Sequence, residues 1–354
     1  MTEKGDLTAP VVLAERLARQ RLTDPVEDAE DFQGLFRLLQ PVGPGFYVRP
    51  GAPPRLDHRT AFDDAPVADR LRARRLLVKA RFLGGTVGYV LADDLALYAN
   101  AFLRPLKLLT ATQRTVLDAV RALGLASPVV IKEETGLLRK EVMPALQRLQ
   151  QAFLVYEDQR DSGWERGWCE FADEWPDVSV GEEHCQEAAA RVLLRFLEAH
   201  VFATSEQMKC WSAFPVRRLA QLLSDLESDG RIAPTVVEGL GEGWTAGDGH
   251  PLPERRPPPC VLMLDKNDML VRSHSAELKR RFGGMEVLEY LLIDGAFRGA
   301  VLGHWGFGPY DVDDIVVELP ARERKARKRE VLKAVEWRYR PPGHPILRYA
   351  GETL

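Results

Sequence analysis

The sequence predicts an α+β protein with three tandem winged helix-turn-helix modules followed by a small antiparallel β-barrel domain. Amphipathic helices precede two alternating runs around a turn between residues 109 and 171, and the same order recurs between 184 and 246. A Pro- and Gly-rich connector then leads into β-branched, apolar runs that end at turn residues. The expected units are an N-terminal winged-helix module with a catalytic-like loop at 1–106, a second at 107–180, a third at 181–250, and a barrel with a C-terminal helix at 259–354.

The N-terminal module is the least regular of the three. Its first helix is expected in VVLAERLARQRL, and its second in DAEDFQGLFRLLQ, where Phe32, Leu35, Phe36 and Leu39 share one face. Its hairpin is expected in LVKARFLGGTVGYVLADDL, with the turn at Gly84-Gly85.

The middle module carries the clearest helix signals. Thr110 is positioned to cap the first helix, which stops at Gly124. The run LRKEVMPALQRLQQ predicts the recognition helix, which Pro144 would kink or shift. A wing is expected around Asp161-Ser162-Gly163. Such modules most often place a helix in the DNA major groove, but they also serve as protein-protein modules and as scaffolding.

The third module and the barrel follow by the same patterns. A long helix is expected over 184–200, an N-cap at Thr204 or Ser205, and a second wing around Gly239-Leu240-Gly241. Beyond the connector, strands are expected in CVLMLDKNDMLV, MEVLEYLLIDGAFRGAVLGHW and DIVVELP, with a hairpin at Asp294-Gly295. A final helix should run from Ala321 to about Tyr339.

The composition of the chain limits the classes of partner and cofactor that it can bind. The net charge of −4 excludes a globally basic, histone-like binder, so a nucleic-acid surface must be a local patch, and basic runs occur at 70–81 and 322–329. The four cysteines form no Cys-x-x-Cys pair and the histidines show no ligand spacing, so we expect neither a metal nor a cofactor. No signal peptide and no apolar run long enough to cross a bilayer are apparent. We therefore expect a cytoplasmic, nucleoid-associated monomer that binds double-stranded DNA and no membrane.

Several segments resemble the AlkZ/YcaQ family of winged-helix DNA glycosylases of the crosslink-repair type. LLQPVGPGFYVRPGAPPRLDHR is similar to the segment in which that family carries Gln-x-Gln or Gln-x-Asp, then an Arg, then a Leu…Arg pair, here Arg49, Leu56 and Arg59. The hairpin ending in Asp93-Asp94 is similar to the family's strand-turn-strand, which ends in an acidic pair before a helix. A C-terminal stretch matches more loosely through Asp268, Arg272, Phe282, Gly283, Glu289 and Tyr290.

The resemblance implies hydrolysis of the N-glycosidic bond of alkylated or crosslinked purines, with Gln40 as the first residue of the catalytic pair. Val42 stands where the second polar residue should be, and Gly88 stands where relatives commonly have His. We therefore expect Gln40 exposed on an inner surface and catalysis degenerate, unless Asp57, His58 or Asp63 takes over. An active glycosylase is the alternative, and a winged-helix transcriptional regulator is a second one.

The residues expected to contact DNA combine these arguments. They are Arg49, Arg59, Arg72, Arg75, Arg139, Lys140, Arg148 and Arg166. Binding should be micromolar or weaker and sensitive to salt, with Arg72, Arg75 and Arg166 dominating the phosphate contacts.

Overall fold

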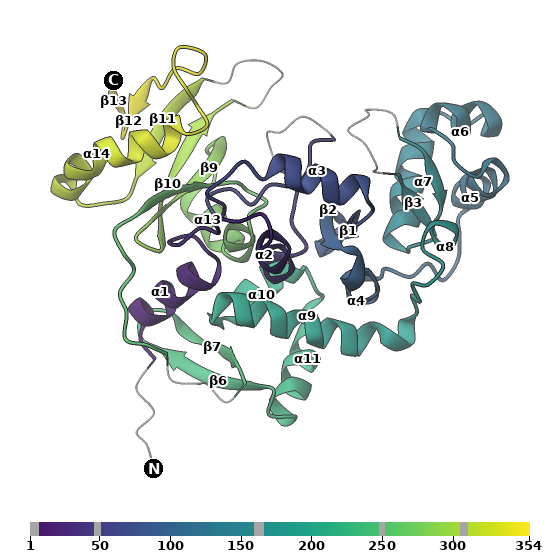
Figure 1. The fold of residues 1–354 in the computed structure, drawn as a ribbon, viewed down its shortest axis with the longest axis horizontal. Helices are drawn as coiled ribbons and strands as arrows, with labels where there is room; N and C mark the ends of the chain where they lie inside the picture. The colour runs from purple at the N-terminus through teal and green to yellow at the C-terminus, as the bar shows by residue number, and fades with distance from the viewer. Residues whose placement is uncertain (1–6, 46–50, 159–165, 248–251, 305–310) are drawn as a thin grey trace.

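A computed structural model describes residues 7–45, 51–158, 166–247, 252–304 and 311–354. Helices and short sheets are mixed along the chain, as predicted for an α+β protein. Helices α5 to α7 lie at one end of the molecule, a larger sheet with α14 lies at the other, and α9 runs between them (Figure 1). None of the described helices is long and apolar enough to cross a membrane.

The first unit, residues 32–102, joins helices to a two-stranded hairpin. Its elements are α2 (Phe32–Leu39), α3 (Ala65–Ala73), β1 (Leu77–Phe82), β2 (Thr86–Leu91) and α4 (Leu95–Phe102). Val42, just after α2, pairs antiparallel with Tyr89 of β2. The hairpin turns at Gly84 and Gly85 as expected, because both residues have positive φ, which glycine adopts without strain.

Helix α1 (Ala9–Arg19) is not the first helix of this unit, which corrects the expectation. Thr8 pairs with Glu238, and Val12 packs with Val201, Phe202 and Val237 of a later unit. The amphipathic pattern of α1 predicted that one face is buried, but such a pattern does not specify the surface that buries it.

The second unit, residues 111–170, has a hydrophobic core of its own. Its elements are α5 (Ala111–Leu123), α6 (Pro128–Thr135), α7 (Arg139–Gln151), β3 (Val155–Glu157) and β4 (Trp168–Glu170), followed by α8 (Phe171–Glu174). Thr110 caps α5 through a capping box with Gln113. Pro144 lies inside α7 without shifting its start, and the expected wing turn at 161–163 lies outside the described residues.

The third unit, residues 185–246, repeats this order. Its elements are α9 (Cys185–His200), β5 (Phe202–Ala203), α10 (Ser205–Ser212), α11 (Val216–Ser228), β6 (Ile232–Val237) and β7 (Gly241–Ala246). Thr204, one of the two expected N-caps, caps α10, and Ser205 is the first residue of the helix. In each unit, a short segment that follows the first helix pairs with the second strand of the hairpin. The pairs are Val42 with Tyr89, Ala126 with Trp168, and β5 with β7. The third unit shares one hydrophobic core with the first.

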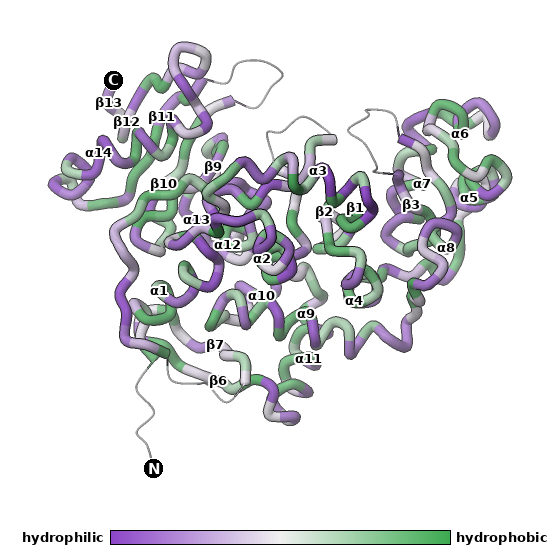
Figure 2. The backbone as a smooth tube through the Cα atoms, in the orientation of Figure 1, coloured by the Kyte–Doolittle hydropathy of each residue, from purple (hydrophilic) through white to green (hydrophobic). Residues whose placement is uncertain are grey.

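The C-terminal unit is a six-stranded sheet in the order β13-β12-β11-β10-β9-β8. Its elements are β8 (Val261–Leu264), α12 (Met269–Ser273), α13 (Ser275–Phe282), β9 (Val287–Ile293), β10 (Ala296–Gly303), β11 (Val312–Val317), α14 (Ala321–Glu336), β12 (Arg348–Tyr349) and β13 (Glu352–Thr353). Helices α12 and α13 cover one face and α14 the other. Figure 2 shows hydrophobic stretches along β9 and β10 between these layers.

Two expectations for this unit change. The described strands form a sheet with edges at β8 and β13, and β12 runs parallel to β11, so the pairing is not purely antiparallel. The parallel pair arises because the chain crosses over through α14 between β11 and β12. Part of CVLMLDKNDMLV is also helical, because the Asp268 side chain accepts the Leu270 N–H and caps α12.

Two histidines, the buried His200 and the half-buried His274, lie where the third unit meets the C-terminal one. Ser273 Oγ lies 3.0 Å from His200 Nε2 and 3.0 Å from His274 Nδ1, and Gln207 Nε2 lies 2.9 Å from His274 Nε2. Burial lowers the pKa of His274 to about 4 and lowers that of His200 well below its usual value. Both rings are therefore neutral at pH 7.

The free energy of unfolding should fall as the pH falls from 6.5 toward 4. The folded-state pKa of each histidine lies below its unfolded value near 6.5, so the stabilisation is complete above that pH and is lost below it. The slope for His274 is about 1.4 kcal/mol per pH unit. Urea unfolding between pH 8 and 5 measures it. His274→Gln should flatten the profile, whereas His184→Gln, at an exposed position, should not. An unchanged slope in His274→Gln would contradict this account.

Candidate active site

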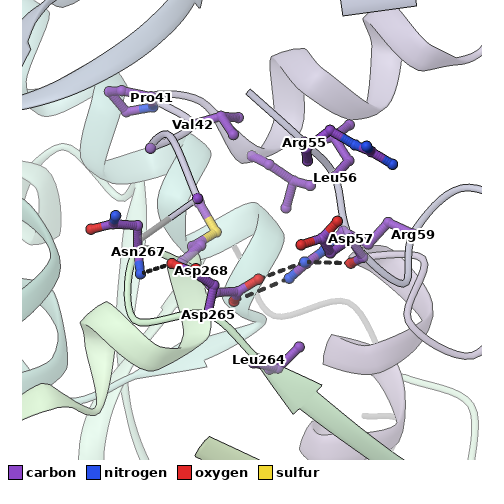
Figure 3. Close-up of a pocket in the computed structure, with 14 residues that line it drawn as sticks. Pro41, Val42, Arg55, Leu56, Asp57, Arg59, Leu264, Asp265, Asn267 and Asp268 are labelled. Carbon is purple, nitrogen blue, oxygen red and sulfur yellow. Dashed lines mark hydrogen bonds and ion pairs between the residues drawn. The ribbon is translucent and has the colours of Figure 1, made fainter. Parts of the chain in front are cut away.

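A pocket lies where three loops of two units meet (Figure 3). Residues 39–45 and 55–59 come from the N-terminal part of the chain, and residues 264–269 connect β8 to α12. Asn267 Nδ2 donates to the Pro44 carbonyl at 2.8 Å, and a Cβ at Gly43 would lie 2.7 Å from that of Asn267. The two loops therefore approach so closely that only glycine fits at position 43 without a shift.

Gln40 stands between two lining residues, Leu39 and Pro41, and is itself only 1% exposed. Its Nε2 donates to Asp94 Oδ2 at 2.7 Å, and its Oε1 accepts the Leu91 N–H at 2.8 Å. Tyr98 Oη donates to the Gln40 carbonyl at 3.1 Å. The expected exposure of Gln40 on an inner surface is therefore wrong. Both ends of its amide are committed to the interior, so Gln40 does not orient a water in this conformation.

Asp94 explains why the glutamine is held. This buried carboxylate also forms ion pairs with Arg37 of α2 and with Arg195 of α9, whose Nη1 lies 2.9 Å from Asp94 Oδ1. A buried carboxylate needs donors on both oxygens, and the Gln40 amide is one of them. Gln40 thus links the end of α2 to the end of β2 directly, and to α9 through Asp94.

Val42 reaches the pocket in its place. Its N–H donates to the Tyr89 carbonyl at 2.9 Å, and its own carbonyl accepts the Tyr89 N–H at 2.8 Å. The half-buried side chain lines the pocket beside Leu39 and Leu56. At position 42, where the family resemblance leads us to expect a polar residue, the pocket therefore has an apolar wall (Figure 3).

Asp57 and His58, two of the other catalytic candidates, have different surroundings. Asp57 lines the pocket, and its Oδ2 accepts from Arg338 Nη2 at 2.6 Å. His58 Nε2 lies 2.7 Å from the Met263 carbonyl, and its ring lies 4.5 Å from that of Trp337. Burial lowers the pKa of His58, so Nε2 of the neutral ring donates to that carbonyl. Asp57 is therefore the better placed of the two to meet a ligand.

Arg59 closes the floor of the pocket instead of facing DNA. It is 3% exposed, and its Nη1 and Nη2 lie 2.6 and 3.2 Å from the two oxygens of Asp268. This bidentate pair joins the first unit to the C-terminal one (Figure 3). The expected DNA contact at Arg59 is wrong, because the guanidinium is enclosed and already paired.

Arg338, which pairs with Asp57 of this pocket, was not singled out from the sequence, and Glu289 was named only for its loose match to the family. Arg338 pairs with Asp57 and Glu289, and its Nη1 lies 3.5 Å from Asp265 Oδ2. Burial raises the pKa of Glu289 to about 7, and Arg338 opposes that rise. One signal was available, because Glu289 interrupts the apolar run VLEYLLI, and a charged residue in a buried strand requires a partner. The sequence does not identify that partner.

The remaining residues expected to contact DNA differ in how far their side chains are buried. Arg72 is 2% exposed and bonds to Asp69 and to the Gly51 carbonyl, so its expected phosphate contact is wrong. Arg148 donates to the carbonyls of Arg104 and Pro105 at 2.8 and 3.1 Å. Both side chains hold loops together.

The other expected contacts, at Arg75, Arg166 and the start of α7, have surroundings unlike those of Arg72 and Arg148. Arg75 Nη1 lies 2.7 Å from Glu174 Oε1, and Arg166 is 9% exposed in a hollow beside Arg139. Arg139 and Lys140 are exposed at the first two positions of α7. Arg49 lies outside the described residues. Among the described members of the predicted set, Arg139 and Lys140 are thus the most accessible cations.

The chain is similar to known DNA glycosylases in sequence and in fold. The family model described as DNA glycosylase AlkZ-like matches residues 55–291. The DNA glycosylase AlkZ of Streptomyces sahachiroi superimposes with a TM-score of 0.67 at 14% sequence identity, covering 98% of this chain and 99% of that one. No curated protein matches the chain. The family match includes Asp57, Arg59 and Asp268 but begins after Gln40 and Val42.

Replacing Gln40 should therefore destabilise the protein. Gln40→Met keeps the length of the side chain but leaves Asp94 without one donor and the Leu91 N–H without an acceptor. Each orphaned buried group costs about 1–3 kcal/mol, so the free energy of unfolding should fall by roughly 2–4 kcal/mol in urea titration. Gln33→Met, at an exposed position of the same helix, is the matched control. Equal stability of Gln40→Met and the parent would show that the amide is not held as described.

Proposed function

The chain belongs to the AlkZ-like DNA glycosylase family, and on that premise we propose that it binds duplex DNA carrying alkylated or crosslinked bases with its glycosylase chemistry weakened. The family membership and the fold support a DNA-repair glycosylase-like role. The burial of the Gln40 amide carries the second part of the proposal. With Val42 beside it, the motif that resembles the catalytic pair offers the pocket no polar group.

The proposed DNA surface rests on the repeated connectivity of the three units. A helix, a short paired segment, one or two further helices and a hairpin follow one another in the order of a winged helix, so we interpret each unit as such a module. In the second unit, α7 takes the place of the recognition helix, and its exposed Arg139 and Lys140 can reach phosphates. We place this monomeric activity on chromosomal DNA in the cytoplasm.

Salt dependence tests the DNA surface. The logarithm of the association constant falls with the logarithm of salt by about 0.9 for each phosphate contact. Arg139→Ala with Lys140→Ala should therefore lower the slope by roughly 2 on a fluorescent duplex. Arg255→Ala with Arg256→Ala removes the same charge from the exposed connector and should leave the slope unchanged. Binding that does not respond to salt, or equal effects of the two double variants, would overturn the placement on α7.

An active glycosylase is the second candidate, and one observation favours it. Asp57, Asp265 and Asp268 line the same pocket as Val42. In hydrolysis of an N7-alkylpurine nucleotide, the C1′–N9 bond breaks, the base leaves with the bonding electrons and neutralises its own positive charge, and water adds to C1′. A carboxylate such as Asp57 would stabilise the cationic sugar and accept the proton of the water.

Excision of N7-methylguanine from duplex DNA separates the two candidates. If catalysis is weakened, the parent should excise slowly, and Val42→Gln should raise the rate about 10²- to 10⁴-fold by adding a group that positions water. Val42→Leu, which keeps the wall apolar, is the control. If the parent is already fast and Asp57→Asn abolishes excision while the duplex still binds, the second candidate is correct and the first is wrong.

A further inference from the structure

A second cavity, of about 460 Å³, lies away from the pocket around Val42 and shares no lining residue with it. Its walls come from α1, from the turn between β6 and β7, from α12 and α13, and from β9 and β10. The volume falls within the range of small-molecule sites, roughly 300–1,000 Å³. The proposed DNA-repair role does not account for this cavity.

Apolar and polar side chains share the lining of this cavity. The larger apolar members are Leu13, Leu17, Leu270, Leu292 and Phe297. The polar members are Arg16, Gln207, His274, Glu277, Arg281 and Arg298. A small-molecule site combines apolar surface with placed polar groups that orient the ligand.

Arg16 is the unusual member of this set. Its side chain is 3% exposed, and in the part of the chain that the structure describes no carboxylate lies within ion-pair distance of it. Burial alone lowers the pKa of its guanidinium to about 10, which leaves it charged at pH 7. A buried charge without a counter-ion is costly, and proteins usually pair such groups.

The end of α9 compensates Arg16 only in part. Arg16 Nε donates to the His200 carbonyl at 3.0 Å, and Nη2 donates to the Phe202 carbonyl at 2.8 Å. These carbonyls lie at and just beyond the helix C-terminus, which carries roughly −0.5 of an elementary charge. Within the described residues Nη1 has no acceptor, so donors and positive charge remain for a ligand in the cavity.

The other charged groups of the lining narrow the class of ligand. Arg281 already pairs with Glu277 and Glu318, and His274 is neutral with its Nε2 beside Gln207. The interior therefore offers one positive charge that is only partly compensated, which suits a monoanion better than a phosphate dianion. Arg298, exposed on β10 at the cavity, adds positive potential where a ligand enters.

We propose that this cavity binds a small amphipathic carboxylate, with its head group on Arg16 and its apolar body against the leucines and Phe297. A ligand seated there touches α1, the third unit and the C-terminal unit at once. Its binding should therefore stabilise the joint between them, by an amount that rises with its concentration above the dissociation constant.

Octanoate is the probe that tests the site on the full chain. Titration calorimetry should give saturable binding of one octanoate per chain, and thermal unfolding should shift upward with its concentration. Arg16→Met should weaken binding at least about tenfold, because a charge-assisted hydrogen bond is lost. Arg19→Met is the matched control: Arg19 lies on the same helix, donates to the Glu198 carbonyl at 2.8 Å and does not line the cavity, so binding should change less than twofold.

Further variants keep the test decisive if Arg16→Met does not fold. Ala296→Trp fills the cavity from β10 and leaves Arg16 in place, and it should abolish octanoate binding. 1-Octanol, which lacks the charge, should bind at least tenfold more weakly than octanoate. No saturable binding, equal binding by Ala296→Trp, or equal binding of 1-octanol would overturn the proposal. Displacement of octanoate by inorganic phosphate or by duplex DNA at a similar concentration would also overturn it, in favour of a phosphate site.

Discussion

The ion pair between Arg59 and Asp268 is the contact on which the candidate site depends. It connects a loop of the first unit to the cap of α12 in the C-terminal unit, across 209 positions of sequence. Removal of one partner from a buried pair typically costs about 3–5 kcal/mol, because the other charge is left without compensation. Loss of this pair should therefore loosen the 55–59 loop against the loop between β8 and α12.

A second group of charges also connects the first unit to the C-terminal unit. Arg338 lies among Asp57, Asp265 and Glu289, so one guanidinium holds carboxylates from the first unit, from the β8–α12 loop and from β9. The carboxylates around the pocket are thus restrained before any substrate arrives. Such preorganisation is what electrostatic stabilisation of a developing positive charge requires. It also means that a change at Arg338 alters the pocket without touching a ligand.

Local features could be predicted from the sequence, because their causes are local. The Thr110 and Thr204 caps and the turn at Asp294-Gly295 depend on residues only a few positions apart, and all are present. The fate of the arginines could not be predicted in the same way. Arg72 and Arg74 belong to one basic run, yet Arg72 is enclosed beside Asp69 while Arg74 is exposed. The contact between Arg72 and the Gly51 carbonyl joins residues 21 positions apart, so a local pattern does not reveal it.

The candidate site shows the same limit at Gln40. The resemblance identified the residue as part of a functional motif, but its burial depends on Asp94 and Arg195, which lie far along the chain. A motif fixes the spacing of side chains along the backbone. It does not specify where a later helix brings a charged side chain, here Arg195 of α9, against Asp94. Gln40 and Val42 are two positions apart, and the structure directs one into the interior and leaves the other at the pocket.

Helix α12 links the pocket to the cavity that Arg16 lines. Met269 at its first position lines the pocket, and Leu270 at its second lines the cavity. Asp268 caps the helix and holds Arg59, so the backbone that forms one wall of the cavity also carries the floor of the pocket. Substitutions on the two sides of so short an element share packing partners, and their effects should not add. The two sites are thus structurally distinct but mechanically connected through α12.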